Sequence, residues 1–222
     1  METKLKGTDK KYTPIVADKD ETSILNIIGN GVNYNDRVIN DREQLKWVIG
    51  VFKKEGKKIV YTGGTYDLLH EGHVKYLEEA KKRGDILIVG VDSDELTRQR
   101  KPDIKNRPIV RLEERLLMLA HVRSVDILTV LDTDEHQDQL VVDILPDVAV
   151  FSKGTKDITE QKIRNNIGDF CGEIVFLQPQ ATTSTTARIR LLAMDGADGL
   201  GKAIVALIQQ HLNPQPQQEV QT

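Results

Sequence analysis

Two histidines separated by a glutamate and a glycine, His70-Glu71-Gly72-His73, are the residues of this chain best suited to chemistry. Imidazoles donate hydrogen bonds near neutral pH and add positive charge when protonated. The pair follows a β-branched and aromatic run, Ile59 to Thr62, and two glycines, and it precedes a helical pattern that ends at Gly84. Both rings should therefore start a helix, where N–H groups and the macrodipole attract anions. The pattern predicts a phosphate-binding site.

Two alternatives compete with a phosphate site. The histidines could be exposed residues at a helix start with no role, although the strand, glycine turn and helix around them make a chance occurrence rare. They could also bind zinc, but their spacing is i, i+3 and the single cysteine, Cys171, lies far away in sequence. We therefore expect no metal site built from the protein alone.

Apolar runs along the chain predict the fold. The first strand, Ile59 to Thr62, is followed by four further runs: Ile86 to Val91, Val125 to Leu131, Asp147 to Ser152 and Ile174 to Leu177. The runs alternate with helical patterns, which is typical of the α/β class. We expect a doubly wound, Rossmann-like parallel five-stranded sheet flanked by helices. Ligands of such sheets bind at the carboxyl ends of the strands, where Gly63 and Asp92 both fall.

Helix signals complete this outline. Asn40 with Glu43 resembles a capping box before an amphipathic pattern. The acidic run 132–135 should cap a helix that ends before Pro146. The helix after the histidines should turn one apolar face inward, made of Val74, Leu77 and Ala80.

Several polar residues near the strand ends have two interpretations each. The segment Asp92-Ser93-Asp94 could cap a helix or contact a nucleotide. The basic stretch 97–108 could be a solvated connector or a loop that closes over phosphates. Arg115 could be an exposed helix charge or turn toward the site. Lys153, followed by a glycine at a strand end, suits a phosphate contact. The hydroxyls of 182–186 exceed what one helix cap needs.

The segment Gly64-Thr65-Tyr66-Asp67-Leu68-Leu69-His70-Glu71-Gly72-His73 resembles the signature of the cytidylyltransferase-like nucleotidyltransferases. Residues from about 38 to 192 are most similar to the adenylyltransferase domain of ADP-heptose synthase. The matching stretches beyond the signature are Val38-Ile39-Asn40, Arg107-Pro108-Ile109-Val110, Glu113-Glu114-Arg115, Arg123-Ser124-Val125-Asp126, Lys153-Gly154 and Ser184-Thr185-Thr186. The heptose branch usually has Thr-Asn-Gly-Cys where this chain has Thr62-Gly63-Gly64-Thr65, so the sugar could differ.

The resemblance implies a role for each candidate residue. The catalytic residues would be His70, His73 and Lys153. The nucleotide would lie against Gly64, Thr65, Tyr66, His70, His73, Asp92, Ser184, Thr185 and Thr186. The second substrate would contact Asp67, Lys101, Arg107 and Lys153, with Lys101 and Arg107 on a substrate loop. Mg²⁺ would bridge phosphate oxygens with few protein ligands.

Composition and apolar patterning indicate the partners, location and domain organisation to expect. A net charge of −3 over 222 residues gives no reason to expect a nucleic-acid surface. One cysteine and the lack of a long apolar run predict a cytoplasmic protein with no membrane segment. We expect an N-terminal extension (1–36), a nucleotidyltransferase domain (37–195) and a C-terminal helix with a flexible tail (196–222). The apolar patch Ile24–Ile28 and the pairing common in the family suggest a homodimer.

Three functions remain in competition. The first is an adenylyltransferase that joins ATP to heptose 1-phosphate or a similar sugar phosphate and releases pyrophosphate. The second is a cytidylyltransferase acting on a polyol or alcohol phosphate; its glycerol-phosphate form carries an arginine run where this chain has Gln178-Pro179-Gln180-Ala181-Thr182. The third is a non-catalytic nucleotide-binding relative, which the intact His70, His73 and Lys153 disfavour.

Overall fold

The computed structural model describes residues 34–100, 107–133, 138–153 and 160–181, together with residues 194, 196–197, 199–202 and 204–205. The chain divides into two units, Met1–Thr182 and Thr183–Thr222. In the second unit the described residues are helical. The domain limits expected at residues 36 and 195 stay predictions, and the patch Ile24–Ile28 lies outside the described residues.

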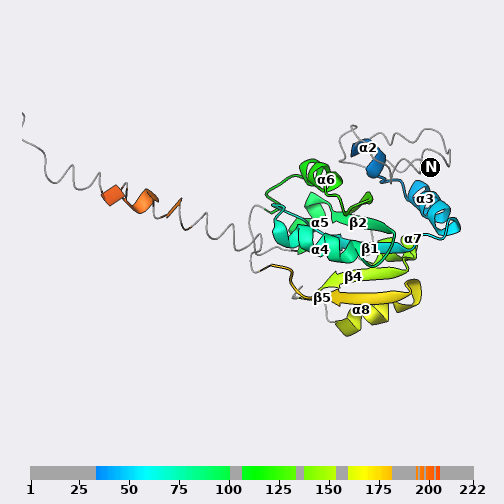
Figure 1. Cartoon of the computed structure of the whole chain (residues 1–222). Helices are drawn as coiled ribbons and strands as arrows, with labels where there is room; N and C mark the ends of the chain where they lie inside the picture. Colours follow the sequence, from blue (N-terminus) through cyan, green and yellow to red (C-terminus); the bar gives the residue numbers. More distant parts are fainter. Residues whose placement is uncertain are drawn as a thin grey trace, which may run out of the picture. The chain divides into compact units, whose positions relative to one another are not determined.

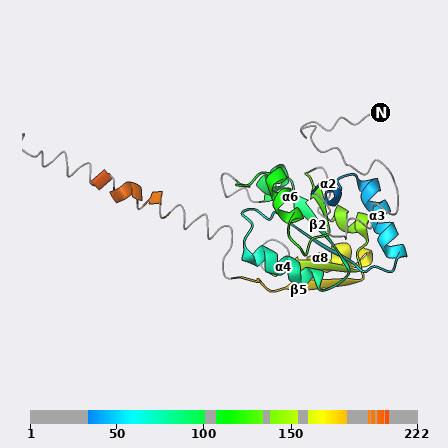
Figure 2. The ribbon, with the colours of Figure 1, turned by 45° about the horizontal axis from the view of Figure 1, so that its top comes forward.

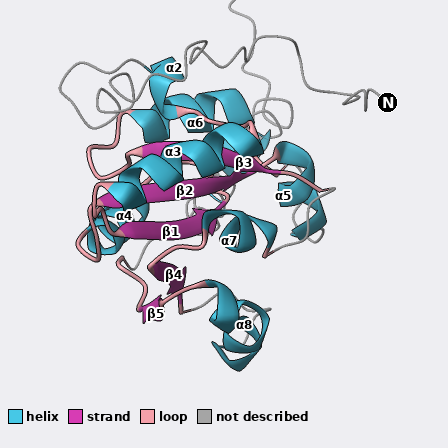
Figure 3. Cartoon of the chain, turned by 90° about the vertical axis from the view of Figure 1, so that its right-hand side faces the viewer, coloured by secondary structure: helices cyan, strands magenta, loops and turns pink. Residues whose placement is uncertain are grey.

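Five parallel strands form the sheet of the first unit, in the spatial order β3-β2-β1-β4-β5. Figure 3 shows this order from top to bottom. The strands are β1 (Ile59–Gly64), β2 (Ile86–Asp92), β3 (Ile127–Leu131), β4 (Val148–Ser152) and β5 (Glu173–Leu177). The order reverses between β1 and β4, because the chain passes from β3 back across the sheet. The predicted doubly wound, Rossmann-like parallel sheet is therefore confirmed.

Helices cover both faces of the sheet (Figure 1). They are α2 (Tyr34–Arg37), α3 (Arg42–Lys54), α4 (Glu71–Lys81), α5 (Asp94–Arg100), α6 (Leu112–Ala120), α7 (Gln139–Ile144) and α8 (Glu160–Ile167), with a 3-10 helix at Gly168–Phe170. Because side chains alternate along a strand, each strand contributes to two separate cores. Ile59 and Tyr61 face one core and Val60 faces the other.

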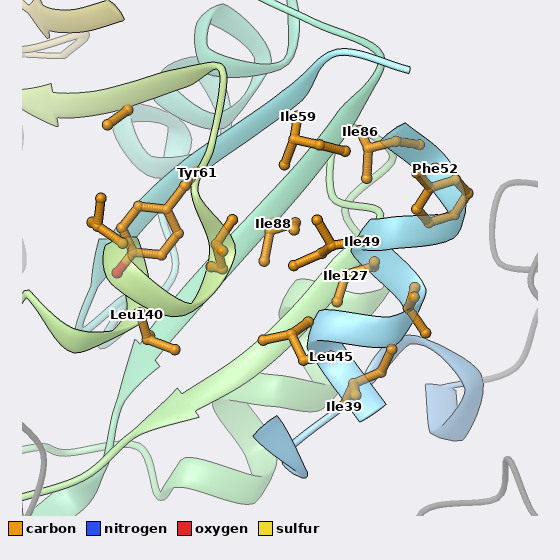
Figure 4. Packing of buried hydrophobic residues seen from close by; sticks show 14 of the residues in the cluster. Ile39, Leu45, Ile49, Phe52, Ile59, Tyr61, Ile86, Ile88, Ile127 and Leu140 are labelled. Carbon is orange, nitrogen blue, oxygen red and sulfur yellow. The ribbon is translucent and has the colours of Figure 1, made fainter. Parts of the chain in front are cut away.

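The first core lies under α3, α7 and α8. Figure 4 shows Leu45, Ile49 and Phe52 of α3 packed onto isoleucines of β1, β2 and β3. These three helix residues are 0–3% exposed, so α3 contributes its whole apolar stripe to the sheet. The second core lies under α4 and α6, and Leu77 and Leu119 are fully buried there.

The segment before α3 extends the β3 side of the sheet. Val38 forms a parallel bridge with Leu128, and the N–H of Ile39 donates to the carbonyl oxygen of Leu128. Helix α2 packs beside α6, as Figures 1 and 2 both show. Residues 34–40 therefore pack as part of the first unit.

Four local expectations prove wrong. Asp41, not Asn40, caps α3 by accepting from the N–H of Gln44, because the Asn40 side chain accepts from Val130 instead. The acidic run 132–135 does not cap α7, which begins after Asp138. Val74 is 40% exposed rather than buried. The polar stretch expected to be a loop from residue 97 is helical in α5 as far as Arg100.

Candidate active site

A turn with unusual backbone geometry links β1 to α4. Tyr66 and Leu68 both have positive φ angles, 52° and 47°, which side chains with a β-carbon rarely adopt. The Tyr66 ring packs so closely on Gly64 that a β-carbon at position 64 would lie 3.3 Å from it. Tyr66 is only 5% exposed, and burial raises the pKa of its hydroxyl well above its ordinary value. Tyr66 is therefore a neutral, packed support for the turn.

His70 begins α4 and caps it with its own ring. Its backbone is extended, and its Nδ1 accepts from the N–H of Gly72 at 3.1 Å. In a neutral imidazole whose Nδ1 accepts, the hydrogen lies on Nε2. The helix cap thus leaves His70 with one N–H donor of defined position.

The two imidazoles stack on each other. The centroids of His70 and His73 are 3.9 Å apart with planes 24° from parallel, and Tyr66 lies edge-on to His73 at 5.5 Å. The predicted pair of imidazoles at a helix N-terminus is therefore present.

Gly72 lies between the His70 ring and Ala181, a residue that follows β5. A β-carbon at this position would lie 3.0 Å from Cε1 of His70 and 3.1 Å from Cβ of Ala181. A side chain at position 72 would therefore press against both His70 and Ala181. Ala181 follows β5 and stands three residues before Ser184, so the chain reaches the histidines just before the predicted hydroxyl run.

Asp92, at the carboxyl end of β2, has its carboxylate occupied by protein donors. The Thr65 hydroxyl donates to one oxygen at 2.8 Å, and Arg100 pairs with the other at 2.7 Å. Ser93 caps α5 by accepting from Leu96, so the segment 92–94 is a helix start as one interpretation had it. The nucleotide contact of Asp92 stays a prediction, and the structure assigns its carboxylate to holding Thr65.

Asp67 and Arg107 lie buried against each other, 2% and 4% exposed, with a nitrogen–oxygen distance of 3.7 Å. The Asp67 carboxylate also accepts from the N–H groups of Ile109 and Val110 at 2.9–3.1 Å. The turn before the histidines is thereby attached to the stretch that begins at the cis peptide Arg107–Pro108. The predicted substrate contacts of both side chains stay predictions.

Arg115 is not an exposed helix charge, because its side chain turns inward toward the carboxyl ends of β1 and β2. Its side chain is fully buried and donates to the carbonyl oxygens of Thr65 at 2.6 Å, Asp92 at 2.9 Å and Val110 at 3.0 Å. A fourth bond goes to the carboxylate of Asp94 at 2.6 Å. Sequence reasoning left its position open, although the residue precedes the buried Leu119 by one helical turn and so shares its inward face.

Lys153 follows β4, which is the neighbour of β1 in the sheet, so it lies at the same edge as the turn. Its side chain is 41% exposed and pairs with Glu160 at 3.2 Å. An exposed pair of this kind is weak, so Lys153 can exchange it for an anionic ligand. Four further predicted residues, Lys101, Ser184, Thr185 and Thr186, lie outside the described residues.

The sequence profile of the cytidylyltransferase-like family matches residues 61–190, which hold this turn, the histidine pair and Lys153. The chain belongs to the cytidylyltransferase-like family. This membership confirms the predicted kind of enzyme, a nucleotidyltransferase.

Two curated relatives are each named bifunctional protein HldE. The protein from Desulfatibacillum aliphaticivorans is 36% identical over 147 residues, which cover 66% of this chain and 29% of the relative. The protein from Shigella sonnei (strain Ss046) is 37% identical over 155 residues, which cover 69% and 31%. This chain thus spans about a third of the length of these relatives. They confirm the resemblance predicted for the nucleotidyltransferase region.

A solved structure of a lipopolysaccharide core biosynthesis protein from Thermoplasma volcanium GSS1 is also similar. It is 27% identical, with a TM-score of 0.48, over 55% of this chain and 97% of that chain. The fold assigned above rests on the strand order and not on this likeness.

A metal ion would find few ligands among the described residues. No group of three or more His, Cys, Asp or Glu side chains in that part of the chain could hold one. The carboxylates of Asp67 and Asp92 are engaged by protein donors. In nucleotide sites, magnesium usually binds to substrate phosphates and to one or two carboxylates of the protein. No helix in the described part is long and apolar enough to cross a membrane.

Proposed function

We propose that the protein transfers an adenylyl group from ATP to a sugar phosphate such as heptose 1-phosphate and releases pyrophosphate. The observation that carries this proposal is the stacked pair His70–His73 at the N-terminus of α4. The pair follows a turn that buried polar contacts attach to the neighbouring segments. Helix N-termini and paired imidazoles stabilise the charge of a nucleotide's phosphates.

The reaction needs little help from a base. An oxygen of the sugar phosphate attacks the α-phosphorus of ATP, a new P–O bond forms, and the bond to the β-phosphate breaks. The attacking phosphate is largely ionised near neutral pH, because its second pKa is about 6. Catalysis then consists of positioning the two phosphates and stabilising the charge that moves to pyrophosphate.

Different residues of the site bind different phosphates of the nucleotide. His70 donates through Nε2 while its Nδ1 caps the helix, and His73 donates from the adjacent turn. The N–H groups of Gly64, Thr65 and Tyr66 face the same phosphates. Ser184, Thr185 and Thr186 bind the departing pyrophosphate, a role supported by the family match over residues 61–190. Mg²⁺ enters with ATP and offsets part of the phosphate charge.

The second substrate lies toward Lys153 and the loop that carries Lys101 and Arg107. Asp67 orients that loop through its bonds to Ile109 and Val110. The HldE relatives favour a heptose phosphate and an adenylyl donor. The protein works as a homodimer in the cytoplasm, where ATP and sugar phosphates are present.

The test is a panel of sugar phosphates and alcohol phosphates offered with either ATP or CTP, with pyrophosphate release as the readout. We expect turnover with ATP and a sugar phosphate, and competition should show tighter binding of ATP than of CTP. The double variant His70→Ala/His73→Ala is the control for contaminating activity. Turnover with CTP and an alcohol phosphate alone would replace the proposal with the cytidylyltransferase alternative. Sedimentation at micromolar concentration tests the dimer, and a single 25.0 kDa species would exclude it.

A further inference from the structure

Arg115 is the most deeply buried charged side chain near the histidines. Its guanidinium is 0% exposed and makes four hydrogen bonds, three of them to main-chain carbonyl oxygens. A buried cation is unfavourable unless its donors are satisfied and an anion lies beside it. Asp94, whose side chain is 30% exposed, provides that anion. The four bonds connect the ends of β1 and β2, the start of α5 and the segment before α6.

The turn that Arg115 contacts does not hold its shape by itself. Tyr66 and Leu68 are two non-glycine residues with positive φ within three positions. Such residues persist only where the surrounding structure holds them, and they gather at sites where geometry matters. Leu68 is two residues from His70, so a change in this turn alters the position of the first imidazole.

Two contacts fix the turn to the segment that follows the cis peptide. Arg115 donates to the carbonyl oxygens of both Thr65 and Val110, while Asp67 accepts from the N–H of Val110. Val110 is thus bonded through both of its main-chain groups, through its N–H to Asp67 and through its carbonyl oxygen to Arg115, which also donates to Thr65. The result is a closed ring of hydrogen bonds around the turn.

We propose that Arg115 is a positioning residue, which holds the turn at residues 65–68 in its left-handed conformation and thereby orients His70 and His73. Arg115 does not contact the substrate. The inference rests on the proposed function for its kinetic consequence, but its structural consequence for the two imidazoles is independent of that function.

The test compares Arg115→Lys with Arg37→Lys in the full chain. Arg37 also donates to two carbonyl oxygens, those of Ala120 and Val125, but at the far end of α6 and before β3. Both substitutions keep the charge and lose the planar fork that reaches several acceptors at once. The readouts are the thermal midpoint, the imidazole NMR signals of His70 and His73, and the kcat and KM for ATP.

We expect both variants to lose thermal stability. Only Arg115→Lys should shift the imidazole signals and lower kcat, by about 100-fold, as for a displaced catalytic group. Its KM for ATP should change less than about threefold, because contacts that matter only in the transition state act on kcat. Arg37→Lys should keep wild-type imidazole signals and kcat.

Unchanged imidazole signals in Arg115→Lys would overturn the inference, as would equal shifts in both variants. If the wild-type protein turns over no nucleotide, the proposed function fails and the NMR comparison still decides the role of Arg115. If Arg115→Lys does not fold, Arg115→Gln, which has no charge to bury, takes its place. If neither folds, Arg115 serves the whole fold and the positioning role is rejected.

Discussion

The two edges of the sheet use the same kind of bond for different purposes. At the amino edge, carboxylates accept from N–H groups where strands begin: Asp147 from Ile59 at 2.7 Å and Asp126 from Leu87 at 2.6 Å. At the carboxyl edge, Asp67 accepts from two N–H groups of a connecting segment instead. The first arrangement starts a strand, and the second holds a loop in place.

The two edges also differ in where their non-glycine residues with positive φ lie. Leu145 has a φ of 47° where α7 ends, a common place for this conformation. Tyr66 and Leu68 have theirs in a turn that leads into two partly exposed histidines. We infer that buried polar contacts at the amino edge serve stability, whereas those at the carboxyl edge also serve the geometry of the site.

The largest effect should come from the histidines themselves. His70→Ala or His73→Ala should each lower kcat by about 10²–10³, equivalent to about 2.7–4 kcal/mol, as for other preorganised donors. His70→Asn should be milder than His70→Ala, because asparagine caps helices and keeps one N–H donor. Steady-state kinetics on the active substrate pair checks this. A kcat/KM within threefold of wild type for both alanine variants would break the proposed mechanism.

The next test exchanges one carboxylate at each edge for an amide. Asp126→Asn weakens the bonds to Leu87 and Lys81 and should lower the free energy of unfolding by about 1–3 kcal/mol with kcat unchanged. Asp67→Asn should cost similar stability and also lower kcat by about tenfold, or about 1.4 kcal/mol. Urea unfolding and initial rates give both quantities. An equal loss of kcat in the two variants would erase the distinction between the edges.

A smaller effect is expected at Lys153. Lys153→Ala should raise the KM for the sugar phosphate about tenfold, as for the loss of one charge-assisted bond, and the KM for ATP less. Glu160→Gln is the matched control, since it removes the ion-pair partner and leaves the lysine. Equal increases in both KM values would contradict the assignment of Lys153 to the sugar phosphate.

The smallest effect at neutral pH is expected from Tyr61 and Tyr76, which should change the free energy of unfolding only at alkaline pH. Burial raises the pKa of Tyr61 and of Tyr76 above the ordinary value of 10.0. In the unfolded chain these phenols ionise from about pH 10 upward, so the folded state binds more protons there. Stability should be constant up to about pH 9 and fall above about pH 10. Tyr76→Phe should flatten this fall in urea unfolding curves, and an unchanged slope would contradict the assignment.

Much of the fold could be predicted because apolar patterning acts locally. The five apolar runs lie within two residues of the observed strands, since a strand buried on both faces needs a continuous run. The histidine pair was recognisable for the same reason, because a strand, a glycine turn and a helix start are adjacent in the chain. The caps failed where a distant group competed: Asn40 bonds to Val130, ninety positions away.

The parallel sheet, the place of His70 and His73 at a helix start, and the family could all be predicted from the residues alone. These features depend on residue type and short spacing, which a single chain displays directly. The contacts of Arg115 became visible only in the folded chain, because its acceptors Thr65, Asp92 and Val110 come from three separate segments. It also decided that Asp67 and Arg107 are buried partners, since only folding brings residues forty positions apart together and removes water from between them.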